Sequence, residues 1–249
     1  MKEKIYTIPI NDAYRSASSC PLCELAEIVQ DNTLTYFLGA SLMDPDVRKS
    51  TNSTGFCGHH LTKLYSAEIN RLGLGLMIHT YLNDLKSDIG EVMQGIASAS
   101  GAFHKSRSPD YTRNLESAAD RIDSRLDSCL ICQKISYTMD RYLDVLLWMF
   151  FEDADFRSLF ESGHKHCLHH TAFLLRGAAK ILTKGQALSF VQILAAQQSR
   201  GMEELAADIE WFTQKFDYRN NDKPWGNSKN AIPRAISFLY GKGDTDDDP

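Results

Sequence analysis

The chain has 249 residues, of which 43% are hydrophobic and 24% charged, and its formal net charge is -5. This length can bury a large core as one domain or as two small ones, so a metal ion is not required to rescue a scaffold too small to fold. The longest apolar run covers only residues 145–151, far short of the roughly 20 residues of a membrane span.

The N-terminal residues lack the apolar segment of a secretory signal, which favours a cytoplasmic protein. Thiols stay reduced there, so Cys-x-x-Cys pairs favour metal or redox chemistry over disulfides. Six thiolates and two zinc dications would change the net charge to about -7, which disfavours nonspecific attraction to nucleic acid or anionic membrane. We therefore expect neither kind of partner.

The first half of the chain predicts two long helices. Residues 1–19 predict an extended or irregular lead-in. From Pro21, apolar residues recur at three- and four-residue spacings and predict a helix that ends near Asp44, because the residue before a proline resists the helical region. Residues 50–55 then predict a polar loop leading to Cys57.

The second predicted helix begins at Cys57 and continues to Ile96, with a bend or break at Gly73 or Gly75. Residues 98–114 contain Ser, Gly and Pro with few apolar side chains. They predict an internal linker.

Near the C-terminus, a long helix is predicted from about Gln186, followed by a polar and aromatic loop, a short helix over 231–240 and an acidic tail over 244–249. An apolar seam follows the long helix at spacings of three and four: Met202, Leu205, Ile209, Phe212 and Phe216. The seam predicts packing against the other half of the chain, with a homodimer contact as the alternative.

All six cysteines fall into two units with the same order, a Cys-x-x-Cys pair followed by Cys-x-x-His. Cys23 to Cys57 is 34 steps and Cys132 to Cys167 is 35, and Asp-x-Asp-x-Arg begins 21 steps after Cys23 and after Cys132. This register predicts an internal duplication. We expect one pseudo-symmetric domain over 1–249, with repeats over 14–100 and 115–216 and a C-terminal loop, short helix and tail over 217–249.

Thiolate and imidazole are preferred zinc ligands, and four protein ligands close a structural site. We predict two Zn²⁺ per chain, one in each repeat. The expected ligands are Cys20, Cys23, Cys57 and His60 in the first repeat, and Cys129, Cys132, Cys167 and His170 in the second. The repeat does not discriminate His59 and His169 from their neighbours, but His60 and His170 lie three residues after a cysteine, on the same helix face.

Rival interpretations are a thioredoxin-like redox pair, which needs a βαβ setting, and an iron–sulfur cluster, which the spacing favours less. His59, His169, His164 and His166 could be outer or exchangeable ligands, against a simpler role as surface or capping residues. The Asp-x-Asp-x-Arg pairs favour helix caps over a second metal site.

The loop over 215–225 is the other candidate site. Asp217, Arg219 and Asp222 could act as an enzyme's residues in a cleft between the repeats. The simpler interpretation is a structural clasp with Trp225 buried and Arg219 paired to an acid. The sequence has no glycine-rich phosphate loop, nucleophile elbow or His-Glu-x-x-His helix, which favours a protein that is not an enzyme.

Three motifs together resemble a family of uncharacterised bacterial proteins of unknown function, over nearly the whole chain. They are Cys20-Pro21-Leu22-Cys23, Gly55-Phe56-Cys57-Gly58-His59-His60, and Lys215-Phe216-Asp217-Tyr218-Arg219 with Pro224-Trp225-Gly226. In that family the histidine of Cys-x-x-His recurs, which supports His60 and His170. The second repeat departs from the pattern, reading Lys165-His166-Cys167. The resemblance implies no activity.

The sequence therefore predicts an all-α, internally duplicated, cytoplasmic zinc-binding protein. Its expected role is a non-enzymatic binding or regulatory module that meets a protein partner, or a second copy, through a groove or the apolar seam. An enzyme and a metal or thiol redox sensor are the alternatives.

Overall fold

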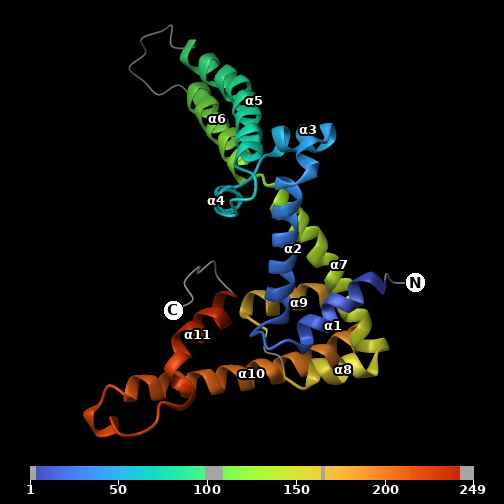
Figure 1. Cartoon of the computed structure of the whole chain (residues 1–249), viewed down its shortest axis with the longest axis vertical. Coiled ribbons are helices and arrows are strands. Elements are labelled where there is room, and N and C mark those ends of the chain that lie inside the picture. Colours follow the sequence, from blue (N-terminus) through green and yellow to red (C-terminus); the bar gives the residue numbers. More distant parts are fainter. Residues whose placement is uncertain (1–3, 99–108, 164–165, 242–249) are drawn as a thin grey trace. The chain divides into compact units, whose positions relative to one another are not determined.

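The computed structural model describes residues 4–98, 109–163 and 166–241, which form α-helices, short 3-10 helices and no strand (Figure 1). The all-α prediction is confirmed for these residues. The α-helices are α1 (Thr7–Arg15), α2 (Pro21–Leu38), α3 (Pro45–Thr54), α4 (Gly58–Ser66), α5 (Arg71–Ser98), α6 (Pro109–Asp127), α7 (Leu130–Glu152), α8 (Ala154–Glu161), α9 (Leu168–Ile181), α10 (Lys184–Gln214) and α11 (Ala231–Tyr240). Short 3-10 helices cover Lys4–Tyr6, Ala40–Met43, Tyr218–Asn220 and Gly226–Asn230.

The chain divides into two compact units. Unit 1 comprises Met1–Ile28 and Tyr137–Pro249, and unit 2 comprises Val29–Ser136. Helix α2 begins in unit 1 and ends in unit 2, whereas α7 begins in unit 2 and ends in unit 1. The units therefore do not coincide with the two sequence repeats, because each repeat contributes to both.

Two segments expected to be irregular are helical. The predicted lead-in contains α1, which buries Ile10, Ala13 and Tyr14. The predicted polar loop over 50–55 belongs to α3 up to Thr54. Its start is capped by Asp44, whose carboxylate accepts bonds from two backbone N–H groups, so the Asp-x-Asp-x-Arg motif caps a helix as expected. Asp153 caps α8 in the same way.

The second long helix is interrupted before the glycines and not at them. Helix α4 ends at Ser66 and α5 begins at Arg71, with Glu68 at φ 53° between them. The Asn70 side chain accepts a bond from Gly73 N at 2.8 Å and donates to the Leu38 carbonyl at 3.1 Å. The Asn70 side chain thus caps the first turn of α5 and donates a hydrogen bond to the carbonyl at the end of α2.

The expected linker and tail are only partly covered by the structure. Residues 99–108 and 242–249 lie outside the described ranges, but 109–114 form the first turns of α6, so this part of the predicted linker is wrong. Pro109 at the first helical position fits, because no intrahelical donor is needed there. The predictions of a long helix from about Gln186 and of a helix over 231–240 are confirmed by α10 and α11.

Each unit has its own apolar core. In unit 1, an aromatic cluster from α1, α7, α8 and α10 has neighbouring ring centroids 5.0–6.5 Å apart. Its members are fully buried: Tyr14, Phe150, Phe156, Phe160 and Phe190. In unit 2, the core is mainly aliphatic and extends to the α6–α7 turn; it contains Leu34, Phe37, Leu38, Leu42, Phe56, Leu64, Leu74, Met77, Cys129 and Ile131.

Close packing of α9 on α7 gives a test of the unit 1 core. A Cβ added at Gly177 would lie 2.5 Å from Leu143 Cδ2, and Leu143 is itself buried. We expect Gly177→Val to lower the free energy of unfolding by about 1–3 kcal/mol through overpacking, measured by urea denaturation. Gly185→Val, at a position with nothing within 4 Å, is the matched control and should change it by less than about 0.5 kcal/mol. Equal effects would contradict this packing.

Candidate metal centres

Both repeats place their cysteines at helix N-termini. Cys20 and Cys129 directly precede α2 and α7, and the next cysteine of each pair lies in the first helical turn. Cys57 and Cys167 are the N-cap residues of α4 and α9, with nearly identical backbone angles of φ -68°, ψ 163° and φ -61°, ψ 159°. Free amide N–H groups and the helix dipole favour a thiolate at such positions.

The first cluster lies in unit 1 and contains Cys20, Cys23, Cys167 and His170. The sulfur of Cys167 is 3.9 Å from that of Cys20 and 3.7 Å from that of Cys23. Nδ1 of His170 lies 3.6, 3.3 and 3.3 Å from the sulfurs of Cys20, Cys23 and Cys167. Four potential donor atoms thus face one another.

The second cluster lies in unit 2 and contains Cys57, His60, Cys129 and Cys132. Nδ1 of His60 lies 3.3 Å from each of the three sulfurs, and the Cys57 and Cys132 sulfurs are 3.9 Å apart. Zinc–sulfur bonds of about 2.3 Å and zinc–nitrogen bonds of about 2.0 Å place tetrahedral ligands about 3.5–3.8 Å apart. The donor sets of both clusters therefore fit one tetrahedral ion each.

The expected grouping within each repeat is wrong, because the structure joins each Cys-x-x-Cys pair to the Cys-x-x-His of the other repeat. Helix α2 has 18 residues and carries the chain about 27 Å from Cys20. The chain then returns only part of the way, since His60 contacts Gln30, which lies in α2 ten residues after Cys20. Cys57 therefore meets Cys129 and Cys132. Both the grouping within repeats and the grouping between repeats have the same order of ligands along the sequence, so the sequence does not distinguish them.

Burial distinguishes the two histidines that could serve as the metal ligand in each cluster. His60 and His170 are buried with Nδ1 toward the sulfurs, whereas the neighbouring His59 and His169 are exposed. Nε2 of His60 lies 3.3 Å from Oε1 of Gln30. A hydrogen bond donated from Nε2 fixes the tautomer in which Nδ1 is free to bind a metal.

The interpretation of His166 as a surface or capping residue is wrong. His166 is fully buried, and its Nε2 lies 2.7 Å from the Tyr14 hydroxyl. Its carbonyl accepts a bond from the Gln198 side chain at 3.0 Å. His166 therefore connects the segment before Cys167 to α1 and α10, outside the set of four potential donors. His164 lies outside the described residues.

The cysteine thiols within each cluster differ in pKa. Hydrogen bonds from Cys20 and Cys23 hold the pKa of Cys167 far below its ordinary value, whereas hydrogen bonds with Cys167 and Cys23, together with burial, raise the pKa of Cys20. Burial opposes ionisation of Cys129, but bonds from His60 and backbone amides lower its pKa to about 6. Burial and the Cys129 thiolate raise the pKa of Cys132 to about 12. A dication would replace the thiol protons, because thiolates are the metal-binding form.

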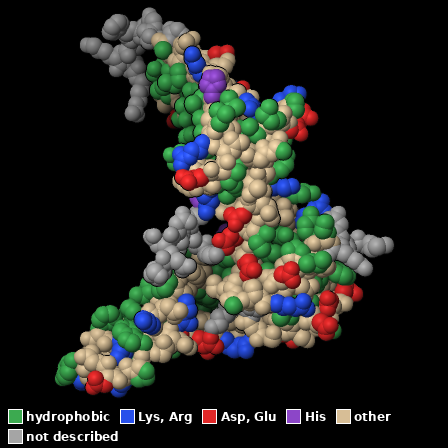
Figure 2. Space-filling view, viewed as in Figure 1, with side chains coloured by type: hydrophobic (Ala, Val, Ile, Leu, Met, Phe, Trp, Pro, Cys, Tyr) green, Lys and Arg blue, Asp and Glu red, His purple; other side chains and the backbone are tan. Residues whose placement is uncertain are grey.

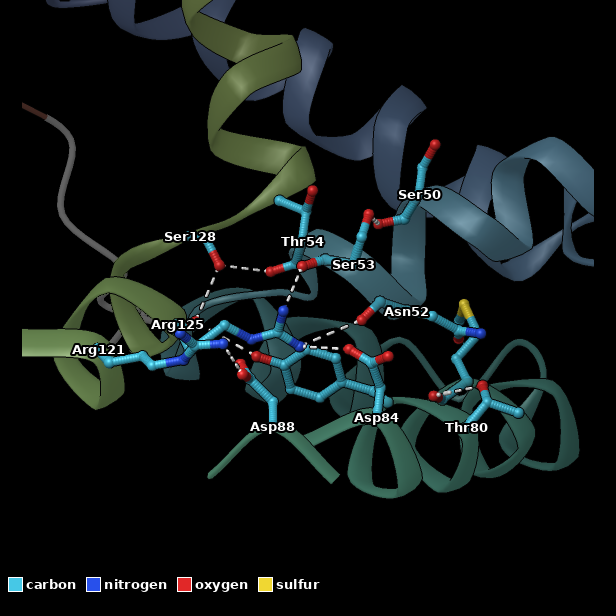
Figure 3. A network of polar contacts seen from close by, with 12 residues as sticks. Ser50, Asn52, Ser53, Thr54, Thr80, Asp84, Asp88, Arg121, Arg125 and Ser128 are labelled. Atoms are coloured by element: carbon cyan, nitrogen blue, oxygen red, sulfur yellow. Dashed lines mark hydrogen bonds and ion pairs between the residues drawn. The ribbon is translucent and has the colours of Figure 1, made fainter. Parts of the chain in front are cut away.

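A polar network joins the two chain segments that lead to the cysteines of the second cluster (Figure 3). Arg125, at the end of α6, donates to the Ser53 and Asn52 carbonyls at the end of α3, at 2.8 and 3.3 Å, and to Asp84 of α5 at 2.8 Å. Ser128 donates to the Thr54 carbonyl at 2.5 Å. The network thus joins the segment before Cys57 to the one before Cys129.

The loop after α10 closes on itself as a clasp. The Lys215 ammonium is buried and donates to the carbonyls of Asn220, Asn221 and Lys223 at 2.6–3.0 Å. Its nitrogen also lies 5.2 Å from the ring centroid of Trp225. This geometry supports the structural interpretation of the loop.

Other residues of the loop are placed partly as predicted. Arg219 pairs with Asp217 as expected, and this pairing lowers the pKa of Asp217. Trp225 is 37% exposed, so its predicted burial is wrong, and Asp222 is exposed. The seam residues Phe212 and Phe216 pack on Trp225, with ring centroids 5.8 and 6.4 Å away.

The comparison with family models identifies the chain's relatives. A model described as a family of unknown function (DUF6062) matches residues 1–246. The chain belongs to this family. Comparisons with curated proteins and with solved structures gave no match. Membership of DUF6062 confirms the resemblance drawn from the motifs and supplies no activity, so function is argued from the two clusters.

The surface adds two observations. No helix among the described residues is long and apolar enough to cross a membrane. On the face shown in Figure 2, acidic and basic side chains are interspersed.

The network around Arg125 gives a test of the second cluster. We expect Arg125→Met to leave the α3 carbonyls and Asp84 without their donor, lowering stability by about 1–3 kcal/mol and weakening zinc retention at the second cluster alone. Thermal unfolding with and without a competing chelator measures both. Arg121→Met is the matched control, since Arg121 is half exposed and pairs only with Asp88 in this network; it should have little effect. An equal loss in both variants would contradict the role of the network.

Proposed function

We propose that the chain is a zinc-binding protein of the cytoplasm, with two structural Zn²⁺ sites and a non-enzymatic binding or regulatory role. The observation that carries the proposal is the closed donor set in each cluster, three sulfurs and one imidazole nitrogen at tetrahedral spacing. Four protein ligands leave no position for a reacting water. The ions would therefore fix structure and not activate a substrate.

The donor atoms favour zinc over other groups. Thiolate and imidazole are soft to borderline ligands, which select zinc over magnesium, calcium or manganese. Sulfur atoms 3.7–3.9 Å apart suit one ion, whereas an iron–sulfur cluster spreads its four protein ligands over two or more irons, which does not suit four ligand atoms that all lie within 4.8 Å of one another. A dithiol redox pair would not need the third sulfur and the histidine.

Long-range closure supports a structural role. The first cluster joins residues 147 positions apart, Cys20 and Cys167, and the second joins Cys57 and Cys132, 75 positions apart. Holding such distant segments together removes chain entropy from the unfolded state, and the free energy of metal binding adds to that of folding.

The proposed partner surface lies on the last two helices. In unit 1, α11 exposes Ile232, Ile236 and Leu239 along one side at three- and four-residue spacings, and Met202 and Phe216 of the seam are also exposed. A repeated apolar stripe on a surface helix supports contact with a protein partner or a second copy.

Paired substitutions test both the metal and the crosswise grouping. We expect Cys20→Ser with Cys167→Ser to remove ligands from the first cluster only, so the purified protein should retain one zinc equivalent. Cys20→Ser with Cys57→Ser removes one ligand from each cluster and should leave little zinc. Elemental analysis after dialysis measures both, beside two equivalents in the wild type.

The grouping within repeats predicts the reverse result for the same two variants, which makes them matched controls for each other. Circular dichroism of each variant checks that its helices are retained. A wild-type protein that holds no zinc, or one equivalent in the second variant and none in the first, would contradict the proposal.

A further inference from the structure

Resting on the proposed zinc sites, we propose that the second cluster is a peroxide-sensitive modification site: a hydroperoxide oxidises Cys132, Cys57 completes a disulfide, and zinc leaves, while the first cluster keeps its ion. The inference rests on a comparison within the chain. The two clusters have the same ligands in the same order, but solvent reaches them differently.

The sulfur geometry of the two clusters is matched. Cys132 and Cys23 are the second cysteines of their pairs, and Cys57 and Cys167 are the N-caps of α4 and α9. Their sulfurs are 3.9 Å apart in the second cluster and 3.7 Å apart in the first. Distance alone therefore gives neither pair an advantage in forming a disulfide.

The two clusters differ in how far their cysteine side chains are exposed to solvent. In the second cluster Cys132 is exposed and Cys57 is half-buried, whereas in the first cluster Cys167 is buried and Cys23 is half-buried. Gly241, which follows α11, covers the first cluster so closely that an added Cβ would lie 3.3 Å from the Cys23 sulfur and 3.5 Å from the Cys167 sulfur. Thiolate oxidation follows exposure, so the second cluster reacts first.

The reaction balances with hydrogen peroxide as the oxidant. The Cys132 thiolate attacks one peroxide oxygen, the O–O bond breaks, and the products are a sulfenic acid and hydroxide. The Cys57 thiolate then attacks the Cys132 sulfur, forming the S–S bond and expelling the second hydroxide. Two thiolates lose two electrons, and peroxide is reduced to two water molecules with two protons taken from solvent.

Cys57 is the resolving residue because its sulfur lies within 3.9 Å of Cys132 and it is less buried than Cys129. Disulfide formation removes two of four ligands, leaving His60 and Cys129, too few to hold zinc tightly. Helix α4 has nine residues and is separated from α5 by a break with Glu68 at positive φ. It is the element that can shift when His60 is released.

The test follows zinc release from the full chain loaded with two equivalents. Hydrogen peroxide is added with a colorimetric zinc chelator, and disulfides are located by peptide mass spectrometry. We expect one equivalent to be released at least about tenfold faster than the other, together with a Cys57–Cys132 disulfide. Dithiothreitol and added zinc should restore the second equivalent.

Two site-isolated variants serve as matched controls. Cys20→Ser with Cys167→Ser keeps only the second cluster and should release its zinc at the fast wild-type rate; Cys57→Ser with Cys132→Ser keeps only the first and should release it slowly. Equal rates, faster release from the first cluster, or a disulfide between Cys129 and Cys132 would overturn the inference. Fewer than two equivalents before peroxide is added would instead overturn the proposed zinc sites themselves.

Discussion

The contact between helix N-termini from different halves of the sequence is the constraint on which the rest of the structure depends. Each cluster joins the start of a long helix, α2 or α7, to the start of a shorter one, α9 or α4. Both helix starts direct free amide groups and positive dipole ends toward the sulfurs. Without the negative charge of thiolates between them, these ends would repel each other.

Charge explains why three cysteines and one histidine suit this arrangement. Three thiolates around a dication leave excess negative charge, which the helix N-termini stabilise. The surrounding residues then set orientation: Gln30 holds the His60 ring, and Arg125 holds the end of α3. In unit 1, His166 and Tyr14 hold the segment before Cys167 to α1. The metal would complete a site that polar contacts already shape.

The two clusters differ in the solvent exposure of their cysteines. The end of α11 covers the first cluster through Gly241, whose φ of 88° suits glycine. Cys132 of the second cluster is exposed. Duplication therefore gives two donor sets of one geometry, with different access for solvent, oxidants and chelators. The first site would suit the proposed structural ion, and the second the proposed response to peroxide.

The sequence was sufficient for the helical class and for the eight clustered residues, because rare cysteines at fixed spacing carry a strong signal. It could not decide the grouping, since the ligands occur in the same order whether the repeats close on themselves or on each other; the structure decides it by placing Cys57 and His60 beside Cys129 and Cys132. Helix α1 was missed because Pro9, in its first turn, resembles a helix breaker although no donor is needed there. The break before α5 was missed because Asn70 acts through a contact with Leu38, 32 residues away.

The most direct test replaces zinc with cadmium-113 and correlates each metal signal with the β-protons of its bound cysteines by NMR. The account predicts two metal signals, one coupled to Cys20, Cys23 and Cys167 and the other to Cys57, Cys129 and Cys132. A metal signal coupled to Cys20, Cys23 and Cys57 together would contradict the crosswise grouping, and the absence of any coupled signal would contradict metal binding itself.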